Sequence, residues 1–231
     1  MINISELAFS YPARGTNVVS SFGMRVEEFA IPLGASTALV GPSGSGKTTL
    51  LGLIAGTLRA ASGSIIVNDQ AITDFSDNQL GQYRIRNVGQ VFQAFELLGY
   101  LTVIENVMLP WYISGGGVKA DIQERAAELL LDVGLESKRR AMPGELSQGE
   151  QQRVAVCRAM LNSPPVLLAD EPTGNLDQEN KQNVVDLLIE QAKRYNSTLL
   201  MVTHDESLLN KFDSVLDMRV VAQPLDAKSR R

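Results

Sequence analysis

The chain has 231 residues, of which 44% are apolar and 20% are charged, enough for one large or two small domains with a buried core. Acidic residues outnumber basic ones by 26 to 21, and this net charge of -5 argues against a protein that wraps nucleic acid, because such proteins carry a basic surplus. The single cysteine, Cys157, excludes an intramolecular disulfide and a cysteine-rich zinc site, and the sequence predicts neither a membrane-spanning segment nor a secretory signal.

Strand-like apolar runs alternate with segments of helical periodicity along the chain. In chain order, we predict strands over 24–31, 36–40, 63–67, 165–169 and 197–203, and helices over 48–57, 119–133, 150–161 and 182–193. Short apolar runs of this kind are typical of central parallel strands that are covered on both faces. From about 93 to 150 the pattern is helix and loop without a strand, which predicts a helical insertion beside an α/β sheet.

The strongest motif lies between a predicted strand and a predicted helix. Residues 41–48 read Gly-Pro-Ser-Gly-Ser-Gly-Lys-Thr and match the phosphate-loop pattern GxxxxGK[ST] in full. Its glycines let successive backbone N–H groups face one anion, and the start of the next helix adds positive potential. Lys47 is expected to reach the β- and γ-phosphates, and Thr48 to offer its hydroxyl to Mg²⁺. The alternative is a plain Gly/Ser turn, which the complete pattern and its context disfavour.

A second motif is the apolar run 166–169, which ends in Asp170 and Glu171. Beside a phosphate loop, Asp170 is expected to hold Mg²⁺ through water, and Glu171 to polarise a water molecule in line with the γ-phosphate. Without that loop, a strand ending in a solvated acid pair would explain the pattern equally well.

The third motif, residues 146–153, reads Leu-Ser-Gln-Gly-Glu-Gln-Gln-Arg. Ser147 and Glu150 form a capping box, which predicts the start of a helix. A helix start with a serine and a glycine is also a ready site for an anion. The structural and the functional interpretation are compatible, so the local sequence does not choose between them.

Taken together, the three motifs resemble those of the ATP-binding cassette (ABC) ATPases, and the resemblance extends from Tyr11 to about Asp217. It implies a P-loop NTPase fold of the α/β class, with a mainly parallel sheet flanked by helices, an N-terminal antiparallel β subdomain and an inserted helical subdomain. It also implies one ABC ATPase domain over 1–231. Residues 1–92 and 163–231 would form the nucleotide-binding core, and about 93–162 the helical subdomain with the signature motif.

The resemblance implies roles for four further residues. Tyr11, placed ahead of the first pair of strands, matches the aromatic residue that stacks on adenine, and Gln93 matches the glutamine that touches Mg²⁺ and the attacking water. Asp177 matches the acidic residue that lies between the two nucleotide sites of a dimer. His204 matches the histidine that contacts the γ-phosphate. A lone histidine is more often structural, but its place after an apolar strand favours the functional role.

These assignments give a complete predicted site. The catalytic residues are Glu171, His204 and Gln93, and the Mg²⁺ ligands are Thr48, Gln93 and Asp170. The ATP-binding residues are Tyr11, Gly41, Pro42, Ser43, Gly44, Ser45, Gly46, Lys47, Thr48, Thr49, Ser147, Gln148, Gly149, Glu150 and Asp177.

Two features depart from the family pattern. Gln148 stands where the signature motif has its first glycine, so a side chain is expected near the γ-phosphate. The late strand that the family follows with Asp-Gly is not evident, and Asp217-Met218-Arg219-Val220-Val221 stands in its place.

Within the family, one branch is most similar to this sequence over residues 93–98, 101–107, 150–153 and 170–177, and it contains the ATPases of lipoprotein release, macrolide efflux and the FtsE-type cell-division pair. This implies a cytoplasmic subunit, peripheral on the inner face of the cell membrane, that dimerises with ATP at the interface and energises a separate FtsX- or MacB-type permease. The segment 97–110, with Leu98, Tyr100, Leu101 and Trp111, is expected to contact that permease.

The sequence leaves two other functions as alternatives. One is a non-transport ABC ATPase acting on DNA or ribosomes, whose members carry a long coiled coil or a second cassette that this sequence lacks. The other is a P-loop small-molecule kinase, which leaves the signature motif and His204 unexplained. No nucleic-acid partner is therefore expected.

Overall fold

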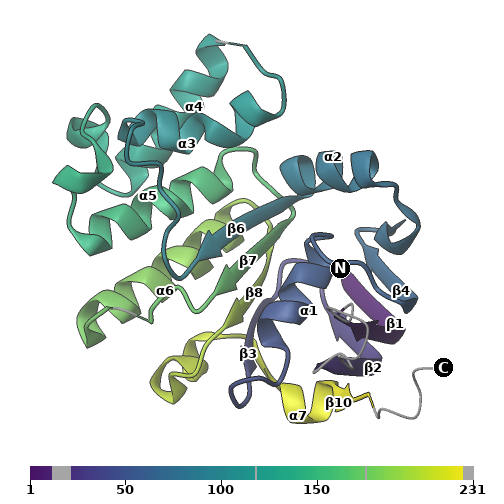
Figure 1. Cartoon of the computed structure of the whole chain (residues 1–231). Helices are drawn as coiled ribbons and strands as arrows, with labels where there is room; N and C mark the ends of the chain where they lie inside the picture. Colours follow the sequence, from purple (N-terminus) through teal and green to yellow (C-terminus); the bar gives the residue numbers. More distant parts are fainter. Residues whose placement is uncertain (12–21, 118, 175, 226–231) are drawn as a thin grey trace, which may run out of the picture.

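The computed structural model describes residues 1–11, 22–117, 119–174 and 176–225, and these contain two five-stranded sheets (Figure 1). The antiparallel sheet has the strand order β10-β2-β1-β4-β5, and the parallel sheet has the order β6-β7-β8-β3-β9. The antiparallel strands are β1 (Ile2–Ser10), β2 (Gly23–Ile31), β4 (Ser62–Val67), β5 (Gln70–Ala71) and β10 (Gln223–Pro224). The parallel strands are β3 (Ser36–Val40), β6 (Val88–Phe92), β7 (Val166–Asp170), β8 (Thr198–Val202) and β9 (Ser214–Asp217).

Helices cover both faces of the parallel sheet. They are α1 (Lys47–Ile54), α2 (Asp77–Asn87), α3 (Val103–Ile113), α4 (Ala120–Asp132), α5 (Gln148–Met160), α6 (Gln178–Arg194) and α7 (Met218–Val221). The described residues also form four 3₁₀ helices, η1 (Ile72–Asp74), η2 (Glu136–Lys138), η3 (Pro143–Glu145) and η4 (Glu206–Lys211). Figure 1 shows α3, α4 and α5 grouped at one end of the molecule, with α1 between the parallel sheet and the antiparallel one.

The side chains of the central strands alternate between two hydrophobic clusters. In β8, Leu199 and Met201 pack with the cluster that includes α3, α4, α5 and α6, whereas Leu200 and Val202 pack with α1 and the antiparallel sheet. All four side chains are completely buried. The continuous apolar runs of the sequence therefore do belong to parallel strands that are covered on both faces, as predicted.

The register of the parallel sheet brings distant loops to one edge. Asp170 at the end of β7 lies opposite Val202 at the end of β8, and Leu39 of β3 pairs with the same Val202. The loops that follow β3, β7 and β8 therefore leave the sheet side by side at its carboxyl edge. This edge is where open parallel sheets place their ligands.

Most of the predicted elements are present with shifts of a few residues at their ends. Gly134, with φ of 70°, follows α4 as the predicted terminating glycine, and the described residues between 93 and 150 contain no strand. Three longer elements, β1, β6 and α2, were not predicted.

The late strand, which is not evident in the sequence, is present without the Asp-Gly that follows it in the family. β9 pairs in parallel with β3, and α7 takes the place of the Asp-Gly turn. β9 is short, and Ser214 and Val215 within it are exposed, so the strand leaves no apolar run in the sequence.

The helical segment does not have a core of its own. Val107 of α3, Leu129 of α4 and Val154 of α5 belong to the same buried cluster as Leu188 of α6 and the strand residues of one sheet face. The division at 92 and 163 stays a prediction. Among the described residues, no helix combines the length and the apolar character that crossing a membrane requires.

Candidate active site

The phosphate loop connects the end of β3 to the start of α1. Gly46 precedes α1 with φ of 96°, in a region of backbone conformation that favours glycine. A Cβ at this position would lie 2.7 Å from Cζ of Phe22 and 3.0 Å from Sδ of Met24. A glycine is thus required here for two reasons. The loop needs a positive φ at this position, and Phe22 and Met24 leave no space for a Cβ.

Lys47, the first residue of α1, is buried under the loop that precedes it. Its Nζ donates hydrogen bonds to the carbonyl oxygens of Gly41, at 2.8 Å, and Pro42, at 3.1 Å. The ammonium group is therefore held against the loop by its own neighbours in sequence. It faces a cavity of about 570 Å³. The cavity is lined by Tyr11, Phe22, Gly41, Ser43, Gly44, Gly46, Lys47, Thr48, Thr49, Glu171 and His204.

Asp170 ends β7 next to the phosphate loop and is hydrogen bonded to the side chain of Thr48. Burial raises the pKa of Asp170 above its usual value, and the negative charge of Glu171 acts in the same direction. The hydrogen bond from Thr48 and the charge of Lys47 oppose this rise. The arrangement brings together two hard oxygen atoms, a hydroxyl of Thr48, which lines the cavity, and a carboxylate of Asp170, which does not line it.

Glu171 adopts a backbone conformation that is uncommon for a residue other than glycine, with φ of 46°. Its N–H donates to the carbonyl oxygen of Val202 at 3.1 Å, which anchors the turn on β8. Its Oε2 lies 3.5 Å from Nδ1 of His204. Strained residues of this kind cluster at functional sites. Here the turn aims the carboxylate into the cavity beside the histidine.

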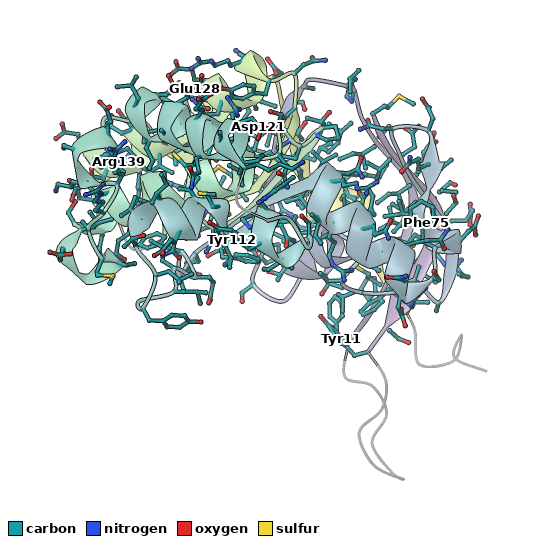
Figure 2. The ribbon with its side chains drawn as sticks, turned by 90° about the horizontal axis from the view of Figure 1, so that it is seen from above. Tyr11, Phe75, Tyr112, Asp121, Glu128 and Arg139 are labelled. Carbon is teal, nitrogen blue, oxygen red and sulfur yellow. The ribbon has the colours of Figure 1, made fainter. Side chains whose placement is uncertain are left out.

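Tyr11 lies at the rim of the cavity, with its side chain 41% exposed. It follows β1 directly and does not precede the first pair of strands, so that part of the prediction was wrong. Its hydroxyl lies 3.3 Å from Oγ1 of Thr49, and its ring makes a T-shaped contact with the ring of Phe9, with 4.9 Å between the ring centroids. Figure 2 shows Tyr11 at the periphery of the molecule, far from Glu128 and Arg139 of the helical segment.

The signature motif lies elsewhere. Ser147 caps α5, its Oγ accepts from the N–H of Glu150, and Oε2 of Glu150 accepts from the N–H of Ser147 at 2.8 Å. Oε1 of Glu150 also accepts from Nζ of Lys138 at 2.5 Å, and these bonds lower the pKa of Glu150 to about 2. Ser147 and Gln148 are exposed at the helix start. Of the described residues that line the cavity, none belongs to this motif.

Asn180 joins the signature motif to Asp177, which caps α6. The N–H and the side-chain amide of Asn180 donate to the two carboxylate oxygens of Asp177, at 2.9 and 2.7 Å. A Cβ at position 149 would lie 3.3 Å from Oδ1 of Asn180. Gly149 and Asp177 are therefore neighbours, outside the cavity of their own chain.

Gln93 follows β6, one residue past the point where Phe92 pairs with Asp170. A Cβ at Gly174 would lie 2.8 Å from the amide nitrogen of Gln93, so this side chain rests on the loop that begins with Glu171. Like Asp170, Gln93 is not among the described residues that line the cavity.

An ion pair that the sequence did not predict holds the loop that carries His204 in place. Nζ of Lys181, in the first turn of α6, donates to Oδ2 of Asp205 at 3.0 Å, and the two side chains are only 20% and 16% exposed. The hydroxyl of Ser207 and the ammonium of Lys181 lower the pKa of Asp205 to about 2. Lys181 and Asp205 are 24 positions apart in the sequence. The only signal there is that Asp205 directly follows His204, which points to Asp205 but not to Lys181.

Comparison with known proteins defines the class. The ABC transporter family model matches residues 25–174, well over half of the chain, so the chain belongs to this family. It is an ATP-binding enzyme that hydrolyses ATP, as predicted.

The similar proteins belong to the lipoprotein-release branch of this family, as predicted. The chain is 38% identical over 215 residues to the lipoprotein-releasing system ATP-binding protein LolD of Idiomarina loihiensis, covering 93% of this chain and 92% of the relative. It is 41% identical over 220 residues to the LolD of Syntrophotalea carbinolica, covering 94% of each. Among solved structures, it matches the dimeric ATP-binding cassette MJ0796 bound to ADP and Pi with a TM-score of 0.81 and 31% identity, covering 94% of each chain.

Proposed function

We propose that the chain is the ATP-hydrolysing subunit of a lipoprotein-releasing ABC complex and that ATP drives it to dimerise. The observation that carries this proposal is the convergence of Lys47, Glu171 and His204 on one cavity beside a curled phosphate loop. These groups come from the carboxyl ends of three adjacent parallel strands. They supply, respectively, a cation for the phosphates, a base for water and a contact for the γ-phosphate.

Glu171 is the general base of this proposal because Asp170 is already engaged with Thr48. Glu171 takes the proton of the attacking water while His204, 3.5 Å away, holds the terminal phosphate. The strained turn at Glu171 fixes the direction of its carboxylate. Tyr11 at the rim is placed to stack on the adenine.

Mg²⁺ fits the oxygen atoms of Thr48 and Asp170, because this ion takes one or two protein oxygens and completes its shell with phosphates and water. Bound there, it would offset the charge of the phosphates. Gln93, resting on the loop after Asp170, is proposed to touch both the ion and the attacking water.

The place of the signature motif supports a dimer. Ser147, Gln148 and Gly149 lie at an exposed helix start, and none of them lines the cavity that holds Lys47. An exposed helix start binds anions well. We infer that Ser147 and its neighbours complete the nucleotide site of a second copy of the chain, with Asp177 beside them at the interface. The cassette MJ0796, to which the chain is similar, is dimeric.

A groove of about 290 Å³ lies beside the helical segment and supports a site for the permease. Its apolar lining includes Phe92 of β6 and Leu109, Pro110 and Ile113 of α3. Phe92 is 39% and Ile113 is 66% exposed. We propose that a cytoplasmic segment of the permease packs here, which would hold the chain at the inner face of the membrane. Gln93, next to Phe92, would connect the groove with the nucleotide.

The groove does not coincide with the residues that the sequence predicts to contact the permease. Trp111 donates its Nε1–H to the carbonyl of Gly117 and packs on Gly116, so its ring is used within the α3–α4 connection. Leu98 and Leu101 are half-buried, and Tyr100 is 75% exposed in the loop before α3.

Substitution of Glu171 by Gln tests the proposal. The variant keeps the size of the side chain and a hydrogen-bonding oxygen but loses the base, whose assistance is typically worth about 10²- to 10⁴-fold in rate. We expect ATP binding to survive, phosphate release to nearly stop and the trapped ATP to hold two chains together. Phosphate release and sedimentation with and without Mg-ATP measure both effects.

Asp186→Asn provides a control, because Asp186 is a carboxylate of α6 paired with Lys211 away from the cavity. It should hydrolyse ATP at the native rate. A Glu171→Gln chain that hydrolyses normally would remove Glu171 from the mechanism. One that binds ATP, stays inert and remains monomeric would contradict the ATP-driven dimer.

A further inference from the structure

The segment 217–225 wraps around the outside of the phosphate loop. β9 runs parallel to β3, and Asp217 at its end pairs with Val40, just before the loop. α7 follows at once, and β10 then pairs with β2 of the other sheet. Figure 1 shows α7 and β10 together beneath α1 and β2. The segment thus crosses from the parallel sheet to the antiparallel one beside the loop.

Within this segment, Met218 packs directly against the phosphate loop. Its side chain is 1% exposed. A Cβ at Gly41 would lie 2.9 Å from Cβ of Met218, and a Cβ at Gly46 would lie 3.6 Å from its Cε. Met218 therefore spans both ends of the curl and packs against the outer side of its backbone.

We propose that Met218 is a positioning residue that holds the phosphate loop in the curvature needed to bind the nucleotide. Loops rich in glycine have many conformations of similar energy, so one that binds tightly must be restrained before the ligand arrives. Met218 does not line the nucleotide cavity, so it does not touch the ligand itself. It acts on the nucleotide through the loop.

Both ends of the segment are fixed, which lets Met218 act as a restraint. Asp217 caps α7 by accepting from the N–H of Arg219 at 2.9 Å and pairs with the guanidinium of the same residue. At the other end, the N–H of Leu225 donates to the carbonyl of Gly23 at 3.0 Å. A helix of only four residues is unstable by itself, so these anchors keep Met218 in place.

The competing explanation is that Met218 only fills the hydrophobic core. Ile65 provides a matched control, because it lies in the same buried cluster, is 2% exposed and sits on β4 away from the loop. We compare the full chain with Met218→Ala, Met218→Leu and Ile65→Ala. Calorimetry gives the Kd for MgADP, thermal unfolding gives Tm, and phosphate release gives KM and kcat.

We expect Met218→Ala to weaken MgADP binding by about tenfold, or about 1.4 kcal/mol, and to raise KM with little change in kcat. Met218→Leu, which refills the space, should restore the affinity to within about twofold. Ile65→Ala should lower Tm and leave the Kd unchanged. The inference rests on the proposed role of the phosphate loop, and a native chain that fails to bind MgADP would reveal failure of that role separately.

A native Kd in the folded Met218→Ala chain, or an equal loss in Ile65→Ala, would overturn the proposal. If Met218→Ala does not fold, Met218→Val provides the test. Val keeps the Cβ near Gly41 but lacks the terminal methyl group that lies near Gly46. Its Kd should then rise, and an unchanged Kd would overturn the proposal in the same way.

Discussion

Gln148 occupies the first position of α5, where its side chain is exposed beside the cap Ser147. In the proposed dimer it would stand close to the γ-phosphate of the partner chain. We expect Gln148→Gly to preserve or raise ATPase activity, because the change removes a side chain from a tight approach to phosphate. Phosphate release at saturating ATP measures the effect.

Gln148→Ala is the control, since it shortens the side chain without adding the backbone freedom of glycine. Similar activity in both variants would assign the effect to the side chain. A fall of about tenfold or more in both, equal to about 1.4 kcal/mol of barrier, would show that Gln148 makes a useful hydrogen bond of its own.

The residues of the site differ in how well the sequence predicts their contacts. Lys47 finds its partners five and six positions away, so the local motif contains most of its environment. Met218 and Lys181 find theirs in segments far along the chain, and apolar or charged residues of these types are common everywhere. Their contributions become visible only when the sheets bring the segments together.

At the scale of elements, α6 steadies the loop that carries His204. The ion pair between Lys181 and Asp205 is mostly buried, so its loss should destabilise the chain by about 1–2 kcal/mol, between the values for exposed and buried pairs. We expect Lys181→Met to lower kcat more than it weakens ATP binding, because the His204 loop is loosened while the phosphate loop is untouched. Steady-state kinetics and calorimetry measure the two effects.

Lys211→Met is the matched control for this prediction. Lys211 also joins η4 to α6, through Asp186, but that carboxylate is 60% exposed and the pair does not adjoin His204. Its removal should leave kcat unchanged. Equal losses of kcat in the two variants would show that the pair at Asp205 has no special connection with the site.

The start of α5 predicts a pH dependence of stability. Glu150 has a pKa of about 2 in the folded chain against an ordinary value of 4.5, because Lys138 and Ser147 stabilise its charged form. Its contribution to the free energy of unfolding is therefore complete above about pH 4.5 and is lost as the pH falls towards 2.

We expect Glu150→Gln to be less stable than the native chain at pH 7 and equally stable near pH 2. Urea unfolding of both chains across this range measures the difference. Other carboxylates with lowered pKa, such as Asp205, change both chains alike and cancel. A difference that stays constant with pH would contradict the assignment.

Elements were predictable where one burial pattern ran through their whole length. β7 and β8 are buried on both faces, and their sequences are continuous apolar runs. α2 buries only Leu80 and Tyr83 among its eleven residues, which leaves too weak a periodicity to detect. In β6, Gly89 and Gln90 interrupt the run, and tertiary packing decides its conformation.

At the scale of the whole molecule, the groove beside α3 predicts how the complex is held together. We expect Ile113→Glu to weaken binding to the permease by about 2 kcal/mol, or about thirtyfold, because it places a charge in an apolar contact. ATP binding by the isolated chain should not change. Co-purification with the permease from detergent-solubilised membranes, at graded concentrations, measures the loss.

Leu131→Glu is the control, because Leu131 is a 59% exposed apolar residue of α4 that does not line the groove. It should co-purify as the native chain does. If both variants are retained equally, the permease binds to another face.

Both outer strands of the antiparallel sheet, β5 and β10, are only two residues long, and β10 includes Pro224, which has no N–H to donate. A long, bare edge strand is a template on which other chains add strands and start aggregates. Pro224 blunts the edge of β10, because it offers no N–H to an added strand. Two copies of the chain can therefore approach each other at β10 with little risk of fusing their sheets.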